Sequence, residues 1–215
     1  KQQVVMLASF NAGAGKTFIS RNLAMSLTFA NKKVCLVDLD LRKGTLTGAN
    51  RRGHKGVTNY LIDDTLTIKD VIQPDHICER VDIIPAGTVA PNPAELLMSD
   101  RLDQMFKELR EQYDYIITDS VPVGIVADAT ISNRIADLTL FVIRIGNIDK
   151  RQLPDLESLY QGNKLNNMAL VLNGGNPRKR KYGYGYGYGY GYGYGYGYGY
   201  GYGYGYGRKR YERSR

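Results

Sequence analysis

The sequence lacks the features that would place the chain in a membrane or outside the cell. No apolar run approaches the roughly 18 residues that a membrane-spanning helix needs, and no signal sequence is present. Only two cysteines occur, Cys35 and Cys78, and they lie in or beside apolar runs without the spacing of metal ligands. This usage is typical of reduced thiols in the cytosol and indicates no zinc site. We therefore expect the chain as given to be soluble.

Acidic residues are nearly absent from the end of the sequence. Residues 178–215 hold nine Lys or Arg and one Glu, a net charge of +8, whereas the residues before them hold 20 bases and 20 acids. This change follows the turn-rich stretch NGGNP, so we predict a domain at 1–175 and a separate tail at 176–215. Because the chain opens at Lys1, with a strand-like run from Gln3, we also expect a longer parent protein.

Short apolar runs rich in Val and Ile recur along the first 175 residues and are typical of buried parallel strands. Helical patterns lie between most of them, and the clearest covers Ala94–Gln112 after a first-turn proline, Pro93. This alternation predicts an α/β fold: a parallel sheet sandwiched by helices, of the P-loop NTPase type, followed by a disordered tail rich in Tyr and Gly. Ligands of such sheets bind at the carboxyl ends of the strands. The predicted strands are Val4–Ser9, Val34–Leu39, Val81–Pro85, Tyr115–Thr118, Leu138–Ile143 and Met168–Leu172.

The stretch VVMLASFNAGAGKTFIS predicts a strand, a phosphate-binding loop and a helix. Gly13 and Gly15 allow backbone amides to turn toward an anion, and the helix presents its positive end. Lys16 can reach the outer phosphates, and the Thr17 hydroxyl can bind Mg²⁺. Phe10 replaces the first glycine of the usual pattern, so a helix-capping loop is the alternative. The predicted nucleotide contacts are Ala12, Gly13, Ala14, Gly15, Lys16, Thr17 and Phe18.

Three aspartates end predicted strands. Asp38 and Asp40 lie in VCLVDLDLRKG, and Asp119 lies in YDYIITDSVPVG. Carboxylates at this edge can hold Mg²⁺ beside Thr17, directly or through water, and one can take the proton of an attacking hydroxyl. A turn or helix cap is the alternative for each. Asn173, at the end of the last strand, could pair with an adenine edge or could simply be a turn residue.

These motifs resemble those of the bacterial tyrosine kinases, whose cytoplasmic catalytic domains accompany the membrane machinery that exports capsular and extracellular polysaccharide. The resemblance covers nearly all of residues 3–173 and rests on NAGAGKTFIS, VDLDLRKG, GTVAPNPAELLMS, YIITDS and a tyrosine-rich carboxyl terminus. It implies ATP phosphates on Ala12 to Thr17, with catalytic roles for Lys16 and the aspartates. Mg²⁺ is implied near Thr17 with Asp119 and Asp38, and a general base among Asp38 and Asp40.

The resemblance also implies a location and partners. Family members work at the cytoplasmic face of the bacterial inner membrane, as rings of subunits arranged head to tail. They act with an upstream transmembrane and periplasmic co-polymerase region, or with a separate membrane activator, and a tyrosine phosphatase resets them. The family's oligomer-forming helix would fall before Lys1, so ring assembly by this chain alone stays open.

If the body transfers phosphoryl groups to tyrosine, the tail becomes its substrate. Fourteen of the 18 tyrosines lie in the tail, thirteen of them in an unbroken run of Tyr-Gly pairs between two basic clusters. Forty flexible residues span roughly 32 to 38 Å, close to the diameter of about 40 Å expected for a 175-residue domain. The tail can thus reach its own site or a neighbour's, and the resemblance favours the neighbour's.

Two other functions fit parts of the sequence. ATPases of the Min and Par partitioning type share the loop and strands, but they carry a signature Lys where this chain has Asn11. Iron–sulfur carrier relatives would need paired cysteines. Tyr-Gly repeats with basic flanks also resemble low-complexity segments that condense or bind single-stranded nucleic acid. The kinase-like body makes nucleic acid the less favoured partner.

Overall fold

The computed structural model describes residues 2–42, 44, 46, 54–75, 78, 80–123 and 131–175. Contacts between Cα atoms group Lys1–Asn176 into one compact unit, which we call the body. The predicted tail at 176–215 lies outside the described residues.

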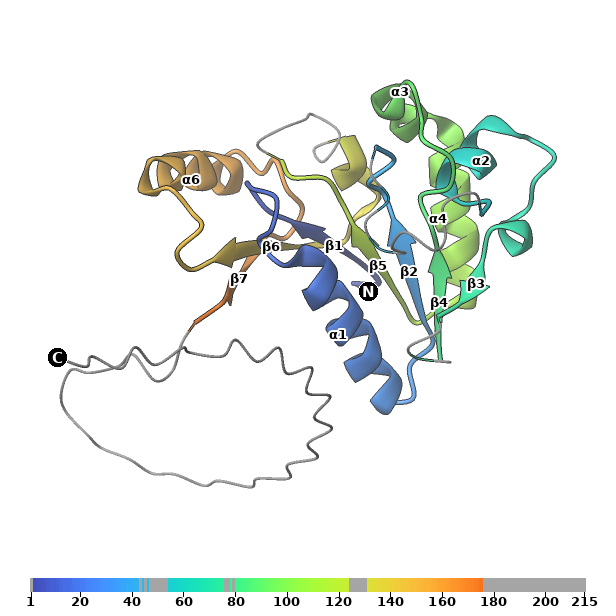
Figure 1. The fold of residues 1–215 in the computed structure, drawn as a ribbon, viewed down its shortest axis with the longest axis horizontal. Helices are drawn as coiled ribbons and strands as arrows, with labels where there is room; N and C mark the ends of the chain where they lie inside the picture. Colours follow the sequence, from blue (N-terminus) through green and yellow to red (C-terminus); the bar gives the residue numbers. More distant parts are fainter. Residues whose placement is uncertain are drawn as a thin grey trace, which may run out of the picture. The chain divides into compact units, whose positions relative to one another are not determined.

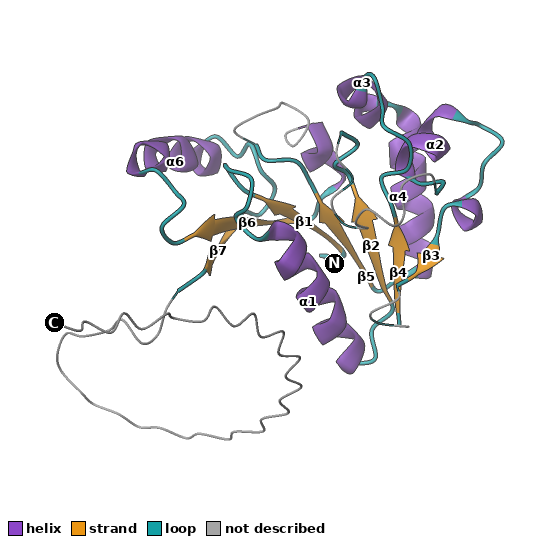
Figure 2. Ribbon diagram, viewed as in Figure 1, coloured by secondary structure: helices purple, strands orange, loops and turns teal. Residues whose placement is uncertain are grey.

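Within the described ranges, the strands form one sheet in the order β3-β4-β2-β5-β1-β6-β7 (Figures 1 and 2). Neighbouring strands are parallel, except that the short edge strand β3 is antiparallel to β4. Every residue of β1 and β2 is buried, as expected for a sheet covered on both faces. The strands are β1 (Val4–Ala8), β2 (Val34–Asp38), β3 (Gln73–Pro74), β4 (Val81–Ile84), β5 (Tyr115–Asp119), β6 (Leu138–Arg144) and β7 (Ala169–Asn173).

Helices cover both faces of the sheet (Figure 1). Side chains of β2 show the two layers, because neighbours along a strand point to opposite faces. Val34 and Leu36 pack in the cluster that contains Ala24 of α1, whereas Cys35 and Val37 pack in the cluster under α4. The α-helices are α1 (Lys16–Phe29), α2 (Val57–Ile62), α3 (Pro93–Met98), α4 (Asp100–Gln112) and α6 (Leu153–Gln161). Short 3₁₀ turns are η2 (Ile68–Asp70), η3 (Asn133–Ile135) and η4 (Lys150–Gln152).

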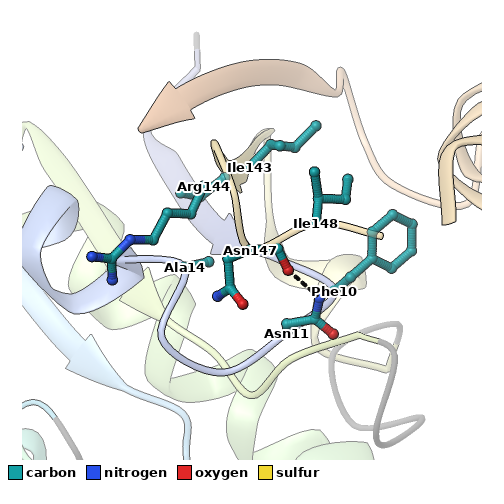
Figure 3. Close-up of a pocket in the computed structure, with 8 residues that line it drawn as sticks. Phe10, Asn11, Ala14, Ile143, Arg144, Asn147 and Ile148 are labelled. Carbon is teal, nitrogen blue, oxygen red and sulfur yellow. Dashed lines mark hydrogen bonds between the residues drawn. The ribbon is translucent and has the colours of Figure 1, made fainter. Parts of the chain in front are cut away.

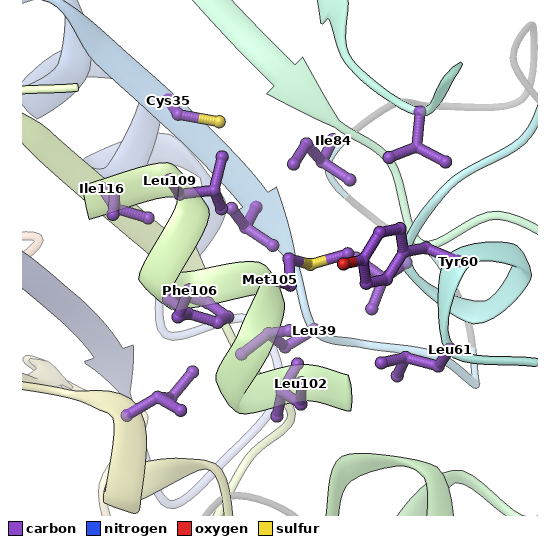
Figure 4. Close-up of a cluster of buried hydrophobic side chains, with 14 of the residues drawn as sticks. Cys35, Leu39, Tyr60, Leu61, Ile84, Leu102, Met105, Phe106, Leu109 and Ile116 are labelled. Atoms are coloured by element: carbon purple, nitrogen blue, oxygen red, sulfur yellow. The ribbon is translucent and has the colours of Figure 1, made fainter. Parts of the chain in front are cut away.

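The cluster under α4 fixes the two strands that carry the acidic residues of interest. Figure 4 shows one stripe of α4 facing Cys35 of β2 and Ile116 of β5, with Tyr60 of α2 alongside. Burying each large apolar side chain of this kind contributes about 1.5 to 3 kcal/mol. The stripe recurs every three or four residues, as one helix face requires, and consists of Leu102, Met105, Phe106 and Leu109. The packing holds β2 and β5 in register, so that Asp38 and Asp119 are paired at their carboxyl ends.

The predicted strands are all present, and their ends differ from the prediction by one residue. The predicted single helix at Ala94–Gln112 is wrong, because the chain forms α3 and α4 with a break at Ser99. Ser99 has an extended backbone (φ −68°, ψ 147°), and its hydroxyl donates to the Leu96 carbonyl at 2.7 Å. The apolar pattern continues across this break and so concealed it. Strand β3 was missed because it is only two residues long and lacks an apolar run.

The two cysteines are free thiols. Cys35 is buried and Cys78 is half-buried. Burial raises the pKa of the Cys35 thiol, which keeps it protonated and unreactive. In the part of the chain that the structure describes, no helix is long and apolar enough to cross a membrane.

Candidate functional site

Two glycines shape the loop between β1 and α1. Gly13 has φ 74° and Gly15 has φ 100°, both in the left-handed region that side chains rarely adopt. A Cβ on Gly15 would also lie 2.2 Å from Nδ2 of Asn173, so no larger residue fits there. Because Gly15 directly precedes α1, the loop lies at the positive end of that helix. The backbone here forms a cradle suited to a phosphate group.

Lys16 places a positive charge at this cradle. Its Nζ donates a hydrogen bond to Oγ of Ser9 at 3.1 Å, across the start of the loop. Burial lowers the pKa of Lys16, and the nearby carboxylates of Asp119 and Asp40 oppose that effect. The ammonium group is therefore held beside the loop, where it can balance phosphate charge.

Thr17, the residue after Lys16, contacts Asp119. The Thr17 hydroxyl donates to Oδ2 of Asp119, whose side chain is buried at the end of β5. Burial raises the pKa of Asp119, while the Thr17 hydrogen bond and the Lys16 charge act against the rise. Oδ1 of Asp119 is buried and has no hydrogen-bond partner among the described residues. A buried acceptor without a hydrogen-bond donor destabilises the folded protein, so this oxygen is a candidate to bind a ligand.

The oxygens at this point fit Mg²⁺. Magnesium prefers hard oxygen ligands and is usually bound by one or two carboxylates together with phosphate oxygens and water. No group of three or more His, Cys, Asp or Glu side chains in the described ranges could hold a metal ion by itself. A metal at Thr17 and Asp119 would complete its shell with water or with oxygens of a bound nucleotide.

Asp38 has a different environment, although it is the register partner of Asp119. Its Oδ1 accepts a hydrogen bond from the Asp40 amide at 3.0 Å, and its Oδ2 accepts one from the Leu46 amide at 2.9 Å. Burial raises the pKa of Asp38 to about 7, although these two hydrogen bonds lower it. Both carboxylate oxygens of Asp38 thus bind backbone amides of the chain that follows β2, and these hydrogen bonds stabilise the turn that contains Asp40.

Asp40 lies close to the other charged groups of the site. It is 7% exposed, and its carboxylate acts electrostatically on Lys16, Asp119 and Asp38. Its backbone carbonyl accepts a hydrogen bond from the amide of Gly44 at 2.8 Å, which tightens the turn. The structure therefore brings together Lys16, Thr17 and the three aspartates that the sequence singled out.

Asn173 and Phe18, two further predicted nucleotide contacts, differ in their surroundings. Asn173 reaches the loop, because its Nδ2 donates to the Ala14 carbonyl at 2.8 Å. Its Oδ1 accepts a hydrogen bond from the Gly174 amide at 2.8 Å, so it also acts as the turn residue that was the alternative. Phe18 is 66% exposed on α1, and its side chain is not packed into the site.

Sequence reasoning missed several polar side chains that surround the loop (Figure 3). Asn11 forms a reciprocal amide pair with Gln152, at 3.0 and 3.4 Å, and its Nδ2 also donates to the Asn147 carbonyl at 3.3 Å. The hollow beside these residues offers about 10 Å³, room for no more than one water molecule. Asn147 and Gln152 lie more than 130 positions from Asn11 in the sequence, so no local motif could have identified them.

The fold and the site together define an α/β domain of the P-loop nucleotide-binding class. The family described as an AAA domain matches residues 2–150. Tyrosine-protein kinase CpsD of Streptococcus pneumoniae is 35% identical over 168 residues, which cover 77% of this chain and 73% of the relative. The solved kinase domain of Escherichia coli tyrosine kinase ETK is 31% identical, with a TM-score of 0.73 over 86% of this chain and 72% of that one. The chain therefore belongs to the bacterial tyrosine-protein kinase family, and the resemblance seen in its motifs is confirmed.

A more distant likeness concerns the fold alone. The septum site-determining protein MinD of Pyrococcus horikoshii, solved with Mg-ADP, is 22% identical, with a TM-score of 0.62 over 79% of this chain and 69% of that one. The partitioning ATPases that we considered as an alternative thus share the architecture of this chain. The relatives at 31% and 35% identity place it among the tyrosine-protein kinases.

Proposed function

We propose that this protein transfers the terminal phosphoryl group of ATP to tyrosine hydroxyls, and that the tyrosines of its own tail are its first substrates. The observation that carries the proposal is the convergence of Lys16, Thr17 and Asp119 at the end of the glycine-shaped loop. A cation, a hydroxyl and a carboxylate at that point are the groups that a magnesium nucleotide requires. The chain's membership of the tyrosine-protein kinase family identifies the acceptor.

Each group of the site has a role in holding the nucleotide. The backbone amides of the loop, from Ala12 to Thr17, receive the phosphates, and Lys16 balances the charge of the outer ones. Thr17 and Asp119 hold Mg²⁺, with Asp38 close by. When bound, the metal neutralises charge on the phosphate oxygens. The exposed face of Phe18 and the amide of Asn173 remain proposed contacts for the rest of the nucleotide.

Asp40 is the favoured general base. In the transfer, the phenolic oxygen attacks the terminal phosphorus, the bond to the leaving ADP oxygen breaks, and a carboxylate takes the phenolic proton. Asp38 has both oxygens engaged by backbone amides, whereas Asp40 lies on the turn that those hydrogen bonds create. Asp38 therefore positions the base rather than acting as it.

The setting that we propose follows from the family. The body works at the cytoplasmic face of the bacterial inner membrane, in a ring of subunits that present their tails to one another head to tail. A membrane co-polymerase region, on the same parent chain or on a separate activator, links the ring to polysaccharide synthesis and export. A tyrosine phosphatase returns the tail to its unmodified state.

Labelled ATP tests the proposed activity. The intact chain is incubated with Mg²⁺ and ATP labelled on the terminal phosphate, and phosphotyrosine is detected beside two variants, Lys16→Met and a chain that ends at Asn176. We expect strong labelling of the intact chain, none of Lys16→Met, and only residual labelling of the shortened chain. Equal labelling of intact protein and Lys16→Met would remove the loop from the mechanism and contradict the proposal.

Mixing two forms of the full chain tests transfer between subunits. A Lys16→Met chain with an added size tag serves as substrate for an untagged active chain. We expect phosphotyrosine on the tagged chain, at a rate that rises with the concentration of the active one. Label confined to the untagged chain at every concentration would show that each tail reaches only its own site.

A further inference from the structure

The carbonyl oxygens of three consecutive loop residues are held by side chains from outside the loop. All three donors come from the chain around the ends of β6 and β7, far from the loop in sequence. The pairs are Asn147 Nδ2 to the Ala12 oxygen at 3.4 Å, Arg144 Nη1 to the Gly13 oxygen at 3.0 Å and Asn173 Nδ2 to the Ala14 oxygen at 2.8 Å. We call Arg144, Asn147 and Asn173 the loop brace.

The sheet register aims two of these side chains at the same place. Arg144 and Asn173 end β6 and β7 and are register partners. They stand two residues after Val142 and Val171, which pack in the cluster beneath α1, so they point to the face from which α1 and the loop emerge. Figure 3 shows the Arg144 side chain extending from the end of β6 past Ala14. The pairing of β6 with β7 thus places two hydrogen-bond donors, Arg144 and Asn173, beside a loop that is distant from both in the sequence.

Because the peptide unit is planar, the hydrogen bonds to the loop carbonyls also fix the direction of the loop N–H groups. In a trans peptide the C=O of one residue and the N–H of the next point in opposite directions, and the unit between them is planar. The structure contains no cis peptide bond among the described residues. Holding the Ala12, Gly13 and Ala14 oxygens on the outer side therefore turns the N–H groups of Gly13, Ala14 and Gly15 to the inner side. Those amides would face a phosphate bound in the cradle.

The glycines make such a brace necessary. Gly13 and Gly15 adopt left-handed conformations, and glycine rotates more freely than any other residue. Without an external hold, the peptide units on either side of each glycine could flip and turn a carbonyl oxygen toward the phosphate. The freedom that lets the loop adopt its shape also lets it lose that shape.

We propose that the loop brace positions the phosphate-binding amides, and that its loss weakens nucleotide binding through the phosphates rather than through the base. This inference rests on the proposed function, since it concerns the same nucleotide site. The brace residues act through the loop backbone and are positioning residues, not catalytic ones. Because the amides hold the phosphates equally before and during transfer, the brace contributes uniform binding, which changes KM and leaves kcat nearly unchanged.

The test uses the full chain, with Arg144→Ala as the main variant. Dissociation constants for ADP with Mg²⁺ are measured by displacement of a fluorescent ADP, and adenosine is titrated in the same way. We expect ADP to bind Arg144→Ala about tenfold more weakly, the size of one lost charged hydrogen bond, and adenosine to bind as in the unchanged protein. KM for ATP should rise by a similar factor while kcat changes less than twofold. Arg144→Lys, which keeps a cation of similar reach, should recover part of the loss.

Arg151→Ala provides the matched control. Arg151 lies on the neighbouring η4 turn, is 90% exposed and pairs only with Asp149 in the described contacts, so its loss should leave ADP binding unchanged. Thermal unfolding of all variants establishes that they are folded. Asn173→Ala separates the two roles proposed for Asn173: a role in the brace alone predicts weaker ADP with unchanged adenosine, whereas an additional adenine contact predicts that adenosine also binds more weakly.

The outcomes distinguish this inference from the function on which it rests. If the unchanged protein fails to bind ADP, the proposed function is wrong. If the unchanged protein binds ADP and Arg144→Ala binds it within twofold, the brace has no role. For Arg144→Ala, a kcat that falls with KM unchanged, or an equal loss for adenosine and ADP, would also overturn the brace.

Discussion

The pKa values of carboxyl groups are shifted in opposite directions at the two ends of the sheet. At the carboxyl end, burial raises the pKa of Asp119 and that of Asp38, the latter to about 7. At the amino end, burial alone would raise the pKa of Asp137, but hydrogen bonds from Arg110 and from the backbone amides of Gln3 and Val4 outweigh it and lower the pKa to about 2. The ionised carboxylate is stabilised at Asp137, which joins strands, and is destabilised at Asp119 and Asp38, where we propose that Mg²⁺ binds.

The difference follows from what each carboxylate contacts. Asp137 accepts two hydrogen bonds from Arg110, at 2.7 and 2.9 Å, and two from the amides of Gln3 and Val4, at 2.8 and 2.7 Å. Asp119 has only the Thr17 hydroxyl on one oxygen, and its other oxygen has no partner within the described residues. The first arrangement contributes stability, and the second keeps an oxygen available for a ligand at a cost in stability.

The largest effect is expected from removing the charge of Asp119. Asp119→Asn keeps the shape but removes the negative oxygen beside Thr17, so phosphotyrosine formation at saturating ATP and Mg²⁺ should fall by about 100-fold or more. Initial rates of tail labelling measure this. Asp155→Asn, on the exposed face of α6, is the control and should retain full activity. A rate for Asp119→Asn within tenfold of the unchanged protein would place the metal elsewhere.

Asp137→Asn should show the reverse profile. The amide cannot accept from Arg110 and both backbone amides as the carboxylate does, so the free energy of unfolding should fall by about 2 kcal/mol. Urea unfolding followed by circular dichroism measures the change. The folded variant should keep its KM for ATP and its kcat, because Asp137 lies at the opposite end of the sheet from the loop. Loss of activity without loss of stability would break the comparison.

The stability of the unchanged protein should fall at low pH because of the same residue. The folded pKa of Asp137 is about 2 and its ordinary value is 3.8, so the unfolded chain takes up the proton first. The contribution of Asp137 is therefore complete above about pH 4 and is lost as the pH falls toward 2, by about 1 to 2 kcal/mol. The difference in unfolding free energy between the unchanged protein and Asp137→Asn should shrink over that range. A constant difference would rule out ionisation of Asp137 as its source.

The smallest effect is expected for the stability of Asp119→Asn without metal or nucleotide. Its amide oxygen can still accept from Thr17, and the change removes a buried charge whose ionisation burial disfavours. The unfolding free energy should stay within about 0.5 kcal/mol of the unchanged value or rise. A decrease as large as that of Asp137→Asn would show that both ends of the sheet serve stability alike.

Local sequence predicted the frame of the fold well. The strands were found because buried parallel strands form short runs of Val, Ile and Leu, and their short length and flanking turn residues separate such runs from buried helices. The break at Ser99 was not found, since Met98, Leu102 and Met105 stand four and three residues apart, a helical spacing that continues across it. Ser followed by Asp100 and Asp103 is a helix-start signal, and it could have revealed the new helix.

The site was predictable only where its residues belong to one motif or to the end of a strand. Lys16 and Thr17 directly follow the glycines of the loop, and Asp119 is the last residue of a buried strand. The hydrogen bond from the Leu46 amide to Asp38 depends on the path of the chain after β2, and no local sequence pattern predicts that path. Arg144 contacts Gly13 of the loop, 131 residues away in the sequence, because β6 pairs with β1.

Mapping of modified residues in the purified protein most directly tests the claim that this body phosphorylates its own tail. The intact chain is incubated with ATP and Mg²⁺ beside Lys16→Met, digested, and analysed by mass spectrometry. The account predicts phosphate on tyrosines between Tyr182 and Tyr211 in the intact chain and unmodified tyrosines in Lys16→Met. Unmodified tail tyrosines in both samples, with ATP shown to be bound, would contradict it.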